Sequence, residues 1–187
     1  DGQAYLYYGG GGICQGGKLQ TNMTAIDGTM RNMTNLVDFH EATWAFKRNA
    51  LYYLTYSDNY PGSNRLHYAT STNPLGPWTH RGIYLDPTGS DTSHGSVVQY
   101  KGQWYAFYHN QAVSGEGPLR SICVDRLYFD TNGLIQKVVQ TTNGVPAESR
   151  STPKPKAARF SPWVLSASPA RERAKPRYLP SRPRARR

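Results

Sequence analysis

Two stretches with the same pattern, Leu51-Tyr-Tyr-Leu-Thr-Tyr-Ser57 and Gln103-Trp-Tyr-Ala-Phe-Tyr-His109, lie 52 positions apart in the chain. Both are rich in aromatic residues, have the length of a strand, and have Asn or Gly within two residues of each end. Runs of this composition are typical of β-strands packed in a core. The pair therefore predicts an internal repeat of β structure.

Further strand-like segments flank both stretches at matching places. Each unit has an inner strand that ends in a basic residue and a turn former, then the aromatic strand, then two more strands separated by turns. The predicted strands cover residues 42–49, 51–57, 65–71 and 79–85 in one unit, and 95–102, 103–109, 120–129 and 134–140 in the next. Four short strands in about 50 residues is the period of a β-propeller blade.

The first part of the chain fits only part of a blade. Residues 1–9, 12–19 and the stretch near 25–28 correspond to the second, third and fourth strands, and no innermost strand precedes them. We therefore predict an all-β fold, a β-propeller with about two full blades plus part of a third, over residues 1–145. A β-sandwich is the alternative, and the repeat disfavours it. The chain opens inside a strand, without an initiator Met, so we expect it to be a fragment.

Charge separates residues 146–187 from the rest. Lys and Arg outnumber Asp and Glu by 12 to 1 over residues 149–187, whereas residues 1–148 hold 10 basic and 11 acidic residues. This basic, Pro-rich tail lacks any apolar periodicity, so it is predicted to be disordered or a sequence artefact. Binding of nucleic acid through the tail is a further hypothesis, which a steep salt dependence would reveal.

Composition excludes other classes of protein. The chain has 187 residues, 37% of them hydrophobic, and no run approaches the roughly 18 apolar residues of a membrane-spanning helix. Its 14 Tyr, 5 Phe and 4 Trp disfavour a helical bundle. Two cysteines, Cys14 and Cys123, do not make a disulfide framework, and whether they pair stays open.

Two polar residues occupy equivalent places in the repeat. Glu41 and His94 come directly before the inner strands of successive units. Because inner strands of a propeller run along its central axis, residues at their starts meet at one mouth of the channel. We therefore predict that Glu41 and His94 converge on one site, although a lone Glu is more often a solvated loop residue.

Seven segments follow one another over residues 1 to about 145. They begin at Asp1 (Asp-Gly-Gln-Ala-Tyr-Leu-Tyr-Tyr-Gly-Gly), Phe39 (Phe-His-Glu-Ala), Lys47 (Lys-Arg-Asn-Ala-Leu-Tyr-Tyr-Leu-Thr-Tyr-Ser), Tyr68 (Tyr-Ala-Thr-Ser), Pro74 (Pro-Leu-Gly-Pro-Trp), His94 (His-Gly-Ser-Val-Val) and Arg120 (Arg-Ser-Ile-Cys-Val-Asp-Arg-Leu). In this order and spacing they resemble the later blades of glycoside hydrolase family 43. The resemblance implies a five-bladed propeller that hydrolyses arabinosyl or xylosyl linkages with inversion, acting on arabinoxylan, xylan or arabinan.

The resemblance also implies roles for single residues. Glu41 matches the general acid, whereas the catalytic base and the Asp that tunes the acid would precede Asp1, which itself matches neither. His94 matches an axial residue that binds substrate and helps to hold a hydrated calcium ion. Arg120 and Phe39 match substrate-binding positions, with a strand ion pair to Glu116 as the alternative for Arg120. No cofactor is required, and a structural calcium ion is compatible.

Two Asn-Met-Thr sequons, at Asn22 and Asn32, favour a secreted protein when combined with an enzyme class that acts on cell walls. The expected partner is a polysaccharide or oligosaccharide, not a nucleic acid or a membrane. The alternative function is a carbohydrate-binding propeller without turnover, because this chain supplies one of three catalytic carboxylates.

Overall fold

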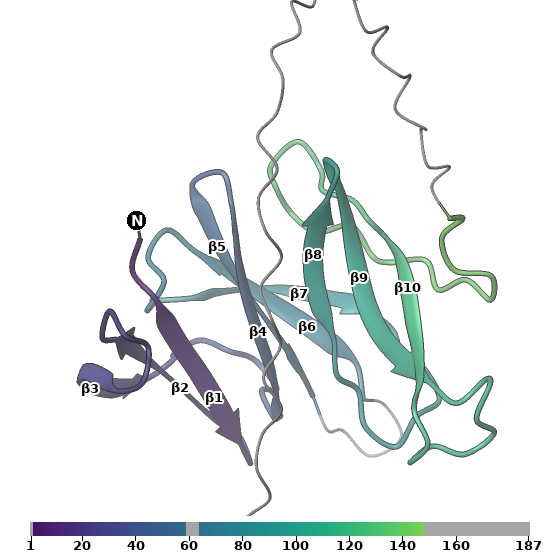
Figure 1. Cartoon of the computed structure of the whole chain (residues 1–187), viewed down its shortest axis with the longest axis horizontal. Coiled ribbons are helices and arrows are strands. Elements are labelled where there is room, and N and C mark those ends of the chain that lie inside the picture. The colour runs from purple at the N-terminus through teal and green to yellow at the C-terminus, as the bar shows by residue number, and fades with distance from the viewer. Residues whose placement is uncertain (1, 59–63, 148–187) are drawn as a thin grey trace, which may run out of the picture. The chain divides into compact units, whose positions relative to one another are not determined.

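The computed structural model describes residues 2–58 and 64–147, and these residues form strands and loops without a helix (Figure 1). It follows that no helix in this part of the chain could cross a membrane. The ten strands are β1 (Tyr5–Gly10), β2 (Ile13–Leu19), β3 (Ile26–Asn32), β4 (Glu41–Arg48), β5 (Leu51–Ser57), β6 (Leu66–Ser71), β7 (Thr79–Leu85), β8 (Ser96–Tyr100), β9 (Gln103–Asn110) and β10 (Ser121–Leu127).

The strands form three antiparallel sheets that follow one another along the chain. Their orders are β1-β2-β3, β4-β5-β6-β7 and β8-β9-β10. Tyr53 and Tyr105 lie in the second strand of the second and third sheets, where the repeat placed them. The predicted all-β fold with blade-like sheets is therefore confirmed.

The second sheet holds the most deeply buried strands. All six residues of β6 are buried, as are the last five of β5, because sheets pack on both sides of these strands. One core cluster, around Tyr53, Tyr84 and Val97, lies between the second and third sheets. The other, around Cys14, Tyr56 and Trp78, joins the first and second sheets.

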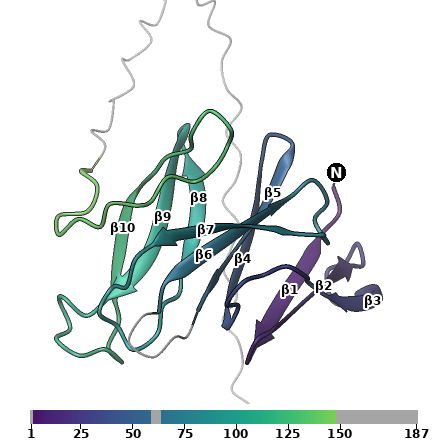
Figure 2. The same cartoon turned by 180° about the vertical axis from the view of Figure 1, so that it is seen from behind.

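Strand β4 lies between β1 and β8, as both views show (Figures 1 and 2). Hydrogen bonds fix this arrangement: Thr43 Oγ1 donates to Tyr7 O at 3.3 Å, and Trp44 Nε1 donates to Val97 O at 2.9 Å. The start of β4 is thereby held close to the start of β8.

One predicted strand is wrong. Residues 134–140 form only a single bridge, between Ile135 and Phe129, so the third sheet has three strands among the described residues. The backbone N–H of Val138 donates to Tyr84 O on β7 at 2.8 Å instead of pairing with β10.

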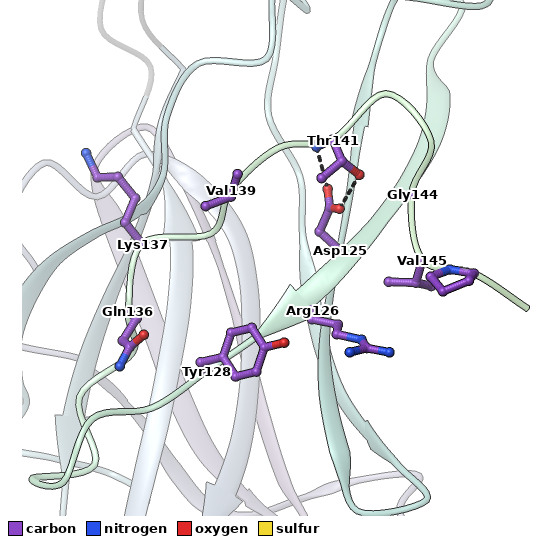
Figure 3. Close-up of a pocket in the computed structure, with 10 residues that line it drawn as sticks. Asp125, Arg126, Tyr128, Gln136, Lys137, Val139, Thr141, Gly144 and Val145 are labelled. Atoms are coloured by element: carbon purple, nitrogen blue, oxygen red, sulfur yellow. Dashed lines mark hydrogen bonds between the residues drawn. The ribbon is translucent and has the colours of Figure 1, made fainter. Parts of the chain in front are cut away.

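A buried carboxylate holds the next part of this segment. Asp125, which is 3% exposed, accepts hydrogen bonds from the N–H and the hydroxyl of Thr141, and a shallow pocket opens beside them (Figure 3). The segment after β10 is therefore fixed by separate contacts to β7 and to Asp125, and these contacts replace a strand ladder. Residues 148–187, which include most of the basic tail, lie outside the described residues.

Candidate functional site

Glu41 is the first residue of β4, and its backbone is fixed from β5. His40 N donates to Ser57 O at 2.9 Å, and Ser57 Oγ donates to Glu41 O at 3.4 Å. The pairing of β4 with β5 shifts register between Glu41 and Trp44, and Ala42 has a φ of 63°, in the left-handed region. A bulge at this place re-aims the strand end, as bulges beside functional sites often do.

His94 ends the connection from β7 to β8, directly before Gly95. A Cβ at Gly95 would lie 2.5 Å from Leu66 Cδ1 and 2.9 Å from the Tyr84 hydroxyl, so the chain passes too close to the core for any larger residue. This close approach sets the position from which the His94 side chain projects.

The structure brings Glu41 and His94 together. Glu41 Oε1 lies 3.7 Å from His94 Nε2, and the two side chains are 34% and 44% exposed. Both residues stand at the starts of neighbouring inner strands, so they share one end of the sheets with open access to solvent. Their roles as acid and as substrate contact stay predictions.

Arg120 lies beside His94 at the same end. Its Nη2 donates to Thr92 Oγ1 at 2.8 Å, which ties it to the loop that carries His94. Arg120, His94, Phe107 and His109 line one shallow hollow. The guanidinium is therefore within the candidate site and bound to Thr92, and among the described residues no ion pair joins it to Glu116.

Phe39 lies mostly in the core. It is 7% exposed and packs against Tyr56, with ring centroids 5.4 Å apart. Little of the ring is left to contact a sugar, so in this structure Phe39 mainly anchors the segment that leads into Glu41.

Sequence reasoning missed His109, at the end of β9. Its Nε2 lies 3.2 Å from His94 N, and its Nδ1 lies 3.2 Å from Ser90 Oγ. Burial lowers the pKa of His109, and the nearby charges of Arg120 and His94 lower this pKa further. A signal existed, because His109 aligns in the repeat with Ser57, which binds the segment around Glu41.

A second buried polar group supports the same end of the second sheet. Asp58, directly after β5, binds Arg65 N at 2.7 Å, Arg65 Nε at 2.7 Å and His67 Nε2 at 2.9 Å. His67 Nδ1 in turn lies 3.1 Å from His80 Nε2. Burial acts to raise the pKa of Asp58, but its bonds to His67 and Arg65 outweigh burial and lower it.

The described residues include no cluster of three or more His, Cys, Asp or Glu side chains that could ligate a metal directly. A calcium ion held by His94 through bound water stays a prediction. The two cysteines are both free, and burial raises the pKa of the Cys14 thiol to about 12. Cys14 and Cys123 therefore do not pair, and Cys14 is not poised as a nucleophile.

Comparisons with known proteins agree on one family. The model of "Glycosyl hydrolases family 43" matches residues 1–135. A β-xylosidase of Xylanibacter ruminicola is 42% identical over 101 residues, which are 54% of this chain and 31% of that protein. An arabinoxylan arabinofuranohydrolase of Bacillus subtilis is 32% identical over 186 residues, with 82% of this chain and 36% of that protein covered.

Solved structures give the same result. The crystal structure of the Bacillus subtilis arabinoxylan arabinofuranohydrolase in complex with cellotetraose matches with a TM-score of 0.71 and 30% identity, over 77% of this chain and 36% of that one. A β-xylosidase/α-arabinofuranosidase from a compost metagenome, in complex with xylotriose, matches with a TM-score of 0.66 and 27% identity, over 72% and 54% of the two chains. The chain spans about a third of the length of the Xylanibacter ruminicola β-xylosidase and of the Bacillus subtilis arabinoxylan arabinofuranohydrolase.

Proposed function

The chain belongs to glycoside hydrolase family 43, and from this premise we propose that it supplies the general acid of an enzyme that hydrolyses arabinosyl or xylosyl linkages in plant cell-wall polysaccharides. The observation that carries the proposal is the 3.7 Å approach of Glu41 Oε1 to His94 Nε2 at the open end of two inner strands. The relatives' names, β-xylosidase and arabinoxylan arabinofuranohydrolase, support the substrate class.

The proposed reaction inverts the configuration of the anomeric carbon. Glu41 gives its proton to the glycosidic oxygen as the bond from that oxygen to the anomeric carbon breaks. A water molecule attacks the same carbon from the opposite face and loses its proton to a second carboxylate, about 6.5–9.5 Å from the first. In this proposal residues outside this chain supply that base, together with the carboxylate that orients Glu41.

His94 and Arg120 would hold the sugar beside the acid. Both line one hollow with His109, and the Arg120 guanidinium presents donors in a fixed plane, which suits paired sugar hydroxyls. A calcium ion at this site would be held through water bound to His94, and no step of the reaction depends on the ion.

The test is Glu41→Gln in the protein extended by the blades that carry the other carboxylates. Since general acid catalysis supplies about 10²–10⁴-fold, kcat on xylosides with poor alkyl leaving groups should fall by that order. Nitrophenyl xyloside should lose less, because nitrophenolate departs with little protonation. Glu116→Gln, the same change on an exposed loop, is the matched control. Equal loss on both substrate classes would argue against the acid role.

The same experiment separates turnover from binding alone. A propeller that only binds carbohydrate would retain xylotriose without releasing xylose, in the extended protein as in its Glu41→Gln variant. Release of xylose that depends on Glu41 rejects this alternative function.

Secretion is a further part of the proposal, and the sequons support it. Asn22 is exposed in the turn between β2 and β3, and its Oδ1 accepts Thr24 N at 3.1 Å. Asn32, the last residue of β3, is exposed too. Expression through a eukaryotic secretory pathway should give a product whose mass falls on enzymatic removal of N-glycans, and Asn22→Gln should remove one glycan. An unglycosylated product retained in the cell would contradict the proposal.

A further inference from the structure

The loop that carries His94 is bound to the third sheet at three places. Ser90 and His94 both contact the His109 ring, and Thr92 accepts from Arg120. His109 therefore contacts the loop on either side of Thr92, while Arg120 holds its middle.

The chemistry of these contacts fixes where the His109 proton lies. A backbone N–H can only donate, so His109 Nε2, 3.2 Å from His94 N, must present its lone pair. A neutral imidazole then carries its proton on Nδ1, which faces Ser90 Oγ at 3.2 Å, and a hydroxyl oxygen can accept it. The opposite tautomer would set an N–H of the ring against the N–H of His94.

We propose that His109 is a positioning residue of the candidate site, which holds Ser90 and His94 through the Nδ1-protonated tautomer and so sets the His94 side chain opposite Glu41. The effect of His109 on substrate binding rests on the proposed function, whereas its tautomer rests on the hydrogen bonds alone. Ser57 gives it independent support, because at the equivalent place in the second sheet it binds the backbone around Glu41.

The direct test is spectroscopic. NMR spectra that correlate imidazole nitrogens with the carbon-bound ring protons distinguish the two tautomers. In the purified protein His109 should show an unprotonated Nε2 and a protonated Nδ1, and Ser90→Ala should keep this tautomer because the N–H of His94 still donates to Nε2. A proton found on Nε2 in the unaltered protein would overturn the proposal, whatever the enzyme activity.

The kinetic test uses two substitutions of one side chain. In the protein extended by the other blades, His109→Phe keeps a ring but removes the acceptor for His94 N–H, and should raise KM for nitrophenyl xyloside about tenfold, with a smaller change in kcat. His109→Gln offers an amide oxygen as acceptor, so its KM should lie close to that of the unaltered protein. Equal losses in the two variants would mean that His109 serves only packing.

The matched control is Tyr53→Phe, on β5 in the second sheet. It removes a buried hydrogen bond of similar length, from the Tyr53 hydroxyl to Gly133 O at 2.7 Å, and Tyr53 does not line the hollow. It should lower stability yet leave KM near that of the unaltered protein. If no pentoside is hydrolysed by any variant of the extended protein, the proposed function fails, while the tautomer result still tests the positioning role.

Discussion

Ser57 and His109 occupy equivalent ends of the second strand in two successive sheets, and each binds the segment that carries a candidate site residue. The Ser57 carbonyl accepts from His40 N, and the Ser57 hydroxyl donates to Glu41 O. In the next sheet His109 Nε2 accepts from His94 N, and His109 Nδ1 lies within hydrogen-bond distance of Ser90 Oγ. The second strands therefore act as rigid supports for the starts of the inner strands. Sites on such supports are held more closely than sites on loops.

Asp58→Asn should destabilise the protein. The Asp58 side chain is fully buried and faces Arg65, whose side chain is 29% exposed, and His67. Loss of one partner of a buried ion pair costs about 3 kcal/mol in the free energy of unfolding, measured by denaturant titration near pH 7. Asp86→Asn, which breaks an exposed pair with Lys137, should cost no more than about 0.5 kcal/mol. Similar costs for the two variants would contradict the burial argument.

The pH dependence of the unaltered protein should report the same carboxylate. A group whose folded pKa is lowered stabilises the fold above its unfolded pKa, about 4 for Asp, and loses this contribution as the pH falls through the folded pKa. The difference in the free energy of unfolding between the unaltered protein and Asp58→Asn should therefore be constant near neutral pH and should decrease below about pH 4. If this difference increased in acid, the direction assigned to the shift in the Asp58 pKa would be wrong.

Gly95→Ala should disturb both stability and the site. The added Cβ would meet Leu66 and the Tyr84 hydroxyl at distances that force the backbone to move, at a cost of about 1–3 kcal/mol. Because His94 is the preceding residue, its amide signal in NMR spectra should shift as well. Gly10→Ala is the control, since a Cβ there has no atom within 4 Å. An unshifted amide signal of His94 in a fully stable Gly95→Ala variant would refute this account of the loop.

The thiols should react at different rates. Cys14 is 3% exposed with a pKa near 12, whereas Cys123 is less buried. A thiol-specific chromogenic reagent should therefore modify Cys123 in the folded protein and Cys14 only on unfolding. A reductant should leave the melting temperature unchanged, because both thiols are free. A drop in melting temperature with reductant would reveal a disulfide.

The sequence was sufficient to predict the second sheet and the meeting of Glu41 with His94. Strands buried on both faces, such as β5 and β6, leave a continuous aromatic and β-branched pattern, and the repeat carries that pattern into the third sheet. Equivalent positions in a repeat imply equivalent places in space, which is why two residues 53 positions apart could be paired.

Other features depend on partners that local sequence does not identify. The Val138-Val139 pair gives residues 134–140 the composition of a strand, yet Val138 N binds Tyr84 on β7, and Val139 is 76% exposed. His109 reads as one more polar residue at a strand end, and only the folded loop shows what its ring binds. The resemblance predicts that Phe39 contacts substrate, whereas packing against Tyr56 keeps most of its surface from solvent.

The 187-residue chain by itself should hydrolyse nitrophenyl xyloside and arabinofuranoside poorly or not at all, whereas the form extended by the blades with the other carboxylates should be active. Glu41 can protonate a leaving group, but proton donation contributes only about 10²–10⁴-fold, and a base and a closed ring of blades must place water and sugar. Reducing-sugar release at equal protein concentration measures the difference, with Glu41→Gln of the extended form as the blank. Robust turnover by the 187-residue chain would show that the base lies among its own residues and that the catalytic assignment is misplaced.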